Sequence, residues 1–241
     1  MPVKEVLLLA VTMTPGGVCL AGMTAEPDPV TGLRWVRPVR ERGPVLLRDI
    51  TTPGGHVLAP FDVVAFHLQQ PRPQPPLAED CIADWQRQRP TIVRRLDGER
   101  RRRFLQQYVD GEPRQVLERQ ERSLCLVKPD WVKGCFRLDP QRGSYEARLS
   151  FGLDKRHYVR PYAKGGLPVT DLKWRALGRS WLAEEGGWLD FDSGDLEVRL
   201  GMQEVYLAVG LARSAEGAFW PTILGVHTLP DYDAAIDYHE W

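Results

Sequence analysis

Cysteine pairs at metal-ligand spacing are absent from this 241-residue chain, and so is any long apolar run. The four cysteines, Cys19, Cys81, Cys125 and Cys135, are widely separated and form no C-x-x-C pair, which argues against a zinc site. No segment approaches the roughly 18 apolar residues of a membrane span, and the N-terminus has no cleavable signal pattern. We therefore expect a cytoplasmic protein with reduced thiols and no bound metal.

A net charge of one sign is also absent, because 32 basic residues balance 32 acidic residues. The whole molecule is not a polycation, so nucleic-acid binding would have to come from a local patch. The glycine pairs at 16–17 and 165–166 lack the strand, loop and lysine arrangement of a nucleotide-binding loop. The histidines and cysteines form no recognisable nucleophile–base pattern. An enzyme is the least favoured of three functional classes, and we predict no catalytic activity and no cofactor.

The beginning of the chain has the pattern of a small β-barrel. Two apolar segments joined by a TPGG turn indicate a hairpin over residues 5–24. Residues 33–40 (LRWVRPVR) alternate apolar residues with arginines, which indicates a strand with one packed face and one wet face. On this strand we expect Arg34, Arg37 and Arg40 to be free for solvent or a partner.

The middle of the chain has a different character. Four prolines in residues 70–76 (QPRPQPP) indicate a stiff spacer between subdomains, and residues 77–88 and 99–109 have helical composition. From residue 86 to residue 122, eleven arginines outnumber six acidic residues, and Arg100–Arg103 are consecutive. Two interpretations are open: a solvated helix surface, or an insert that contacts phosphates.

Strand patterns return after this block. Residues 205–213 and 219–228 are apolar segments on either side of a short loop, which predicts a hairpin of two central strands. Residues 172–183 have the composition of a helix. Residues 159–162 and the LEVRL segment at 196–200 have the composition of short strands.

These patterns predict a mainly β (β-rich α+β) fold with two small barrels. The first barrel is expected in residues 1–70, and a proline-marked connection with a basic helical insert in residues 71–122. The second barrel is expected in residues 123–241, with an acidic loop and tail. The helical block is too long, and the strands too irregularly spaced, for an immunoglobulin-like sandwich.

Four segments of the chain keep a recognisable order and spacing along nearly its whole length. They are GGVCLAG (Gly16–Gly22), WVRPVR (Trp35–Arg40), VTDLKW (Val169–Trp174) and LAVGLAR…FWPTILGVH (Leu207–His227). The ordered set resembles the bacterial family of dual OB domain-containing proteins. This resemblance implies two OB-type barrels in one chain and supplies no catalytic residues. The resemblance assigns no role to the arginine-rich block at roughly 77–122.

OB-type barrels often bind single-stranded nucleic acid in a basic groove, with exposed aromatic residues that stack on bases. The chain places basic residues beside aromatic residues in four clusters, and Trp35 or Trp174 is expected to stack if exposed. The predicted nucleic-acid contacts are Arg34, Trp35, Arg37, Arg40, Lys128, Trp131, Lys133, Arg156, Lys173, Trp174 and Arg175, together with Arg100, Arg101, Arg102 and Arg103.

The favoured function is therefore non-catalytic binding of single-stranded DNA or RNA, as an accessory protein in a larger nucleic-acid-handling or defence system. The alternative is a scaffold subunit whose basic faces meet acidic patches on a protein partner. Neither function involves a membrane.

Overall fold

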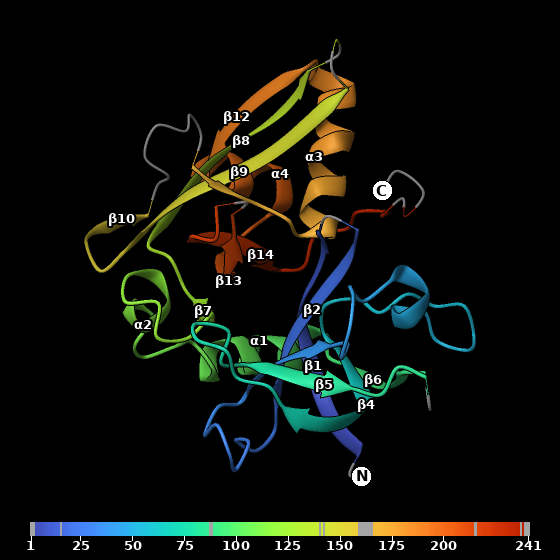
Figure 1. Ribbon diagram of the computed structural model, residues 1–241. Helices are drawn as coiled ribbons and strands as arrows, with labels where there is room; N and C mark the ends of the chain where they lie inside the picture. The colour runs from blue at the N-terminus through green and yellow to red at the C-terminus, as the bar shows by residue number, and fades with distance from the viewer. Residues whose placement is uncertain are drawn as a thin grey trace. The chain divides into compact units, whose positions relative to one another are not determined.

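The computed structural model describes residues 3–14, 16–86, 89–139, 141, 143–158, 166–214, 216–236 and 238. The chain folds as two compact units (Figure 1). The first unit comprises Met1–Cys125 and Gly210–Trp220, and the second comprises Leu126–Val209 and Pro221–Trp241. In the described part of the chain, no helix is both long enough and apolar enough to cross a bilayer.

The first unit is built on a closed ring of five strands. Hydrogen bonding runs in the order β1-β2-β3-β5-β4, and β4 also pairs with β1, which closes the ring. β3 and β5 are parallel, whereas the other pairs are antiparallel. The strands are β1 (Val3–Thr14), β2 (Gly17–Thr24), β3 (Trp35–Val39), β4 (Asp62–Pro71) and β5 (Asp80–Ala83).

Aliphatic side chains fill this ring, and glycine allows its strands to approach. Leu8, Leu20 and Val64 are fully buried. A Cβ atom at Gly22 would lie 2.2 Å from the carbonyl oxygen of Leu7, so only glycine fits at this position of the β1–β2 pairing. Outside the ring, β6 (Thr91–Arg95) pairs with the first half of β4, and η1 (Leu47–Ile50), α1 (Gly98–Gln107) and α2 (Arg114–Leu117) complete the unit.

A second circuit of strands, most of whose residues lie in the second unit, repeats this order. β8 pairs with β9, and β9 pairs with β11. A parallel bridge between Val169 and Ile223 leads to β14, which pairs with β13, and β13 pairs with β7. Three residues join β7 to β8 and complete the circuit. The strands are β7 (Leu124–Val127), β8 (Trp131–Asp139), β9 (Ser144–Leu153), β11 (Leu167–Pro168), β13 (Glu204–Arg213) and β14 (Phe219–Leu229).

The connection between β11 and β13 carries most of the second unit's additional structure. It contains α3 (Leu172–Glu185), β12 (Trp188–Asp192) and α4 (Ser193–Leu200), while β10 (Arg156–Tyr158) extends β9. Figure 1 shows α3 running along one side of the β9–β8–β12 sheet. The rings of Trp174 and Trp181 on α3 pack with those of Phe136 on β8 and Phe191 on β12, with centroids 4.9 to 6.4 Å apart.

Asp171 fixes the start of α3. One carboxylate oxygen accepts hydrogen bonds from the backbone N–H groups of Lys173 (2.8 Å) and Trp174 (3.1 Å), as an N-cap residue does. The other oxygen accepts from the N–H of Val226 on β14 (2.7 Å). Burial raises the pKa of Asp171 to about 6, although these three hydrogen bonds favour the charged form.

The predicted β-rich fold with two small barrels is confirmed, and the helix expected at 172–183 is present as α3. The helix expected at 77–88 is wrong, because this segment contains β5 and pairs with β3 and β4. Of residues 70–76, the first two end β4 and the rest begin its connection to β5 within the first ring, so the predicted spacer between subdomains is also wrong. The LEVRL segment at 196–200 belongs to α4 and is not a strand. The strand expected at 159–162 lies outside the described residues.

Candidate nucleic-acid interface

The three arginines of the 33–40 segment do not lie together on one solvent-exposed face. Arg37 is only 8% exposed, and its Nε donates to Asp80 on β5 at 2.5 Å. Arg40 donates to the buried Asp49 at 2.6 Å. The guanidinium of Arg34 lies 5.7 Å from the ring centroid of Tyr108. The expectation that Arg37 is free for a partner is therefore wrong, because ring closure places a carboxylate opposite it.

The two tryptophans chosen for base stacking are both buried. Trp35 is 7% exposed and Trp174 is fully buried. Stacking was expected only of an exposed ring, so neither side chain provides one. Both serve as packing residues, which is the usual role of a large aromatic side chain.

The arginine run on α1 separates into different environments. Arg101 is 5% exposed and lies over the Phe61 ring at 4.1 Å. Arg103 pairs with Glu99 one turn earlier at 3.2 Å. Arg100 is exposed and Arg102 is half-buried. Consecutive residues point around a helix, so the run does not form one basic stripe.

The predicted residues of the second unit are dispersed and several are already paired. Lys128 pairs with Glu204 at 2.5 Å, and Lys173 pairs with Asp231 at 2.9 Å. Arg175 lies over the Tyr145 ring at 4.7 Å, and burial lowers its pKa. Trp131 packs edge-on against His157, while Lys133 and Arg156 are exposed.

A cleft of about 350 Å³ opens in the first unit where β3 and β5 end beside β4. Two guanidinium groups, a half-buried indole ring and two side-chain amides line it, together with two acidic residues. The lining residues are Arg40, Glu41, Arg42, Gln69, Ile82, Ala83, Asp84, Trp85 and Gln86.

The side chains of this cleft are held in different ways. The indole Nε1 of Trp85 donates to the carbonyl oxygen of Val39 at 3.3 Å, and its ring meets Phe66 edge-on at 5.7 Å. The Nε atom of Arg40 is buried and has no hydrogen-bond partner among the described residues. Arg42 and Gln69 are exposed. The cleft thus combines a fixed aromatic ring with two guanidinium groups and an equal number of carboxylates. An aromatic ring beside cations is the pairing that single-stranded nucleic acids require.

Of the cleft residues, only Arg40 was predicted. Trp85 and Gln86 were missed because they fall in the segment expected to be helical. Trp85 lies close to Arg87 and Arg89 in the sequence. This is the same pattern of an aromatic residue beside basic residues that defines the four predicted clusters.

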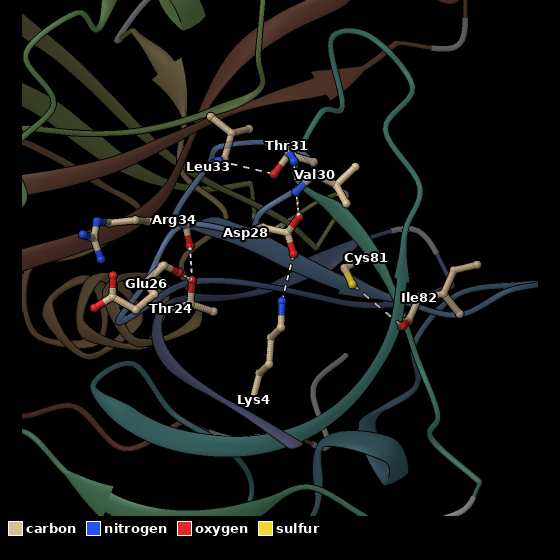
Figure 2. Close-up of polar contacts among 10 residues, drawn as sticks. All are labelled: Lys4, Thr24, Glu26, Asp28, Val30, Thr31, Leu33, Arg34, Cys81 and Ile82. Carbon is tan, nitrogen blue, oxygen red and sulfur yellow. Dashed lines mark hydrogen bonds and ion pairs between the residues drawn. The ribbon is translucent and has the colours of Figure 1, made fainter. Parts of the chain in front are cut away.

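A second, smaller pocket lies at another part of the first ring. Figure 2 shows the polar contacts of several residues that line it, including Lys4 and Asp28. Lys4 on β1 pairs with Asp28 at 2.8 Å, and Asp28 also accepts hydrogen bonds from the N–H groups of Val30 and Thr31. Burial raises the pKa of the lining Cys81 thiol to about 11, so this thiol stays protonated. The pocket has a volume of only about 20 Å³, and its cation already has a carboxylate partner. The larger cleft is the better candidate site.

The two units differ in charge. Counting whole ranges, the first unit contains 19 basic and 16 acidic residues, a net charge of +3. The second contains 13 basic and 16 acidic residues, a net charge of −3. The neutral total therefore conceals a basic unit and an acidic unit.

Comparison with known families gives one match. A family model described as a dual OB-containing domain matches residues 4–176, which cover most of the chain. Neither the curated proteins nor the solved structures contain a match.

Proposed function

The chain belongs to the dual OB-containing domain family. Because OB folds in general often bind oligonucleotides, we propose that its first unit binds single-stranded nucleic acid. The observation that carries the proposal is the cleft in which Arg40, Arg42 and Trp85 meet. Binding involves no chemical step. We propose the protein to be a cytoplasmic accessory component of a nucleic-acid-handling or defence system.

Electrostatics favours the first unit as the binding unit. Phosphate contacts dominate the affinity of proteins for nucleic acids, and each needs a cation that is free to approach. Arg42 and Arg48 are exposed and make no ion pair within the described part of the chain. The net charge of +3 on this unit attracts a polyanion, whereas the net charge of −3 on the second unit repels one.

The geometry of Trp85 favours a single strand over a duplex. Its ring is fixed by the bond to Val39 and by Phe66, so little side-chain entropy is lost when a base stacks on it. A base is available for stacking only when it is unpaired. The amides of Gln69 and Gln86 can donate and accept hydrogen bonds at the edges of such a base.

Fluorescence anisotropy with labelled single-stranded DNA, single-stranded RNA and duplex DNA tests the proposal. We expect the single strands to bind more tightly than the duplex, with affinity that falls as salt rises. Absence of binding at low salt, or a preference for duplex, would contradict it.

Two matched charge reversals locate the site. Arg42→Glu should weaken single-strand binding about tenfold and reduce the magnitude of the salt slope, because it removes one phosphate contact and adds a repulsion. Arg114→Glu makes the same change at an exposed position on α2 outside the cleft and should have a much smaller effect. Equal losses in the two variants would show general attraction to the unit without a site at the cleft.

A further inference from the structure

The strand β12 forms one edge of the second unit's larger sheet. The order of that sheet is β10-β9-β8-β12, and no described strand pairs with the outer side of β12. An unpaired edge presents backbone donors and acceptors that another extended chain can use.

The register shows which backbone groups point outward. Trp188 lies opposite Arg137 and Asp190 opposite Cys135. The N–H of Leu138 donates to the carbonyl oxygen of Gly187 at 2.8 Å, which makes Leu138 and Gly187 a hydrogen-bonded pair. In an antiparallel ladder these pairs alternate, so the N–H and C=O groups of Trp188 and Asp190 point away from β8.

Side chains beside this edge are exposed and chemically mixed. Trp188 is 52% exposed, and the guanidinium of Arg137 lies 3.7 Å from its ring centroid. Asp190 and Asp192 are exposed on the same face of the strand, since alternate residues of a strand share a face. Asp190 has no ion-pair partner in the part of the chain that the structure describes.

The charge of the side chains around β12 indicates which charge a partner would carry. The ends of α3 and α4 that flank β12 add carboxylates. The basic residues beside the edge are Arg137 over the Trp188 ring, Lys133 opposite Asp192, and Arg199, which pairs with Glu185. This surrounding belongs to a unit with a net charge of −3, which repels phosphate groups and attracts lysine and arginine. The acidic residues around β12 are Glu184, Glu185, Asp190, Asp192, Asp195 and Glu197.

We propose that the outer edge of β12 binds an extended basic segment of a partner protein, which adds to the sheet as a further strand. The outward groups of Trp188 and Asp190 supply the backbone hydrogen bonds, and the alternating side chains supply specificity. An antiparallel segment places basic residues opposite Asp192 and Asp190 and an apolar or aromatic residue opposite Trp188. Its pattern is then basic-x-basic-x-apolar.

A labelled peptide containing Lys-Val-Lys-Val-Trp, added to the full chain, tests the proposal by fluorescence anisotropy. We expect saturable binding, and we expect the charge-reversed peptide Glu-Val-Glu-Val-Trp to bind at least about tenfold more weakly. Failure of the basic peptide to bind, or equal binding of the two peptides, overturns the proposal.

A matched pair of variants separates strand addition from simple charge attraction. Asp190→Pro removes the outward N–H and the charge, whereas Asp190→Ala removes only the charge. Proline is tolerated here because this N–H makes no bond to β8. We expect Asp190→Pro to weaken peptide binding about tenfold beyond Asp190→Ala. Equal losses would contradict strand addition, provided circular dichroism shows that both variants fold.

Two further measurements complete the test with the protein unaltered. A peptide with N-methyl groups on the backbone amides that face β12 should bind about tenfold more weakly, and unchanged binding contradicts strand addition. A single-stranded oligonucleotide should not displace the peptide. Displacement of the peptide from the wild-type chain would assign this edge to nucleic acid and overturn the proposal.

Discussion

The two units repeat one circuit of strands, yet they are stabilised by different interactions. In the first, ion pairs join neighbouring strands. Arg37 on β3 pairs with Asp80 on β5 within the ring, and Arg95 on β6 pairs with the buried Asp62 on β4. In the second, four aromatic rings pack between the sheet and α3. Two units with the same order of strands can therefore differ in the side chains of their cores and in their surface charge. The function of each unit has to be inferred from its own side chains.

The largest effect should come from the aromatic cluster. Trp174→Ala should lower the free energy of unfolding by about 5 kcal/mol, because it removes a fully buried ring that contacts Phe136, Phe191 and Tyr232. Trp188→Ala, at an exposed ring of the same unit, should change it by less than about 1 kcal/mol. Urea denaturation measures both. Similar values for the two variants would contradict the role assigned to the cluster.

Removing a buried charge from the first unit should have the next largest effect. Asp80→Ala should lower the free energy of unfolding by about 3 to 4 kcal/mol, because it leaves the guanidinium of Arg37 buried without its carboxylate. Glu5→Ala breaks the exposed pair with Arg94 and should cost less than about 1 kcal/mol. If both substitutions cost little, ion pairs do not stabilise this ring.

Asp171 should make the second unit sensitive to pH. Its folded pKa of about 6 lies above its unfolded value, so its contribution to stability is complete below about pH 4 and is lost as pH rises through about 6. The stability difference between the wild-type chain and Asp171→Asn should therefore fall by about 3 kcal/mol between pH 4 and pH 7. Denaturant titrations at several pH values measure it, and a constant difference would show that the pKa is not raised.

The smallest effects should come from substitutions of the arginines on α1. These substitutions distinguish an arginine that packs in the fold from arginines that are available to contact phosphates. Arg101→Ser should cost about 1 to 2 kcal/mol of stability, because Arg101 packs over Phe61. Arg100→Ser with Arg102→Ser should leave stability nearly unchanged. If α1 contacts phosphates, this pair of substitutions should weaken single-strand binding and flatten its salt dependence. An unchanged salt slope would remove α1 from the binding surface.

The sequence predicted the barrels because their strands are apolar and separated by turn residues. It failed at β5, a strand of four residues whose conformation is set by pairing with β3 and β4. No local sequence pattern predicts that this segment pairs with β3 and β4. The error at 196–200 was avoidable, because Asp192 and Asp195 have the spacing of a capping box, which the structure confirms at the start of α4.

Candidate site residues were harder to predict than the fold. Alternation in the 33–40 segment correctly predicted a strand. It did not show that Arg37 would form a buried ion pair with Asp80, 43 positions later. The cleft joins residues 40–42 to residues 69 and 82–86, and one sequence does not show which of these distant residues meet. Trp85 also lay inside the segment wrongly expected to be helical.

Amide hydrogen exchange with and without a saturating single-stranded oligonucleotide tests the central claim most directly, because it reports on both units at once. We expect slower exchange in residues 39–42 and 82–86 of the first unit and no change in β8, β9 and β12 of the second. Protection confined to β8, β9 and β12, with the cleft unchanged, would contradict the assignment of nucleic-acid binding to the first unit.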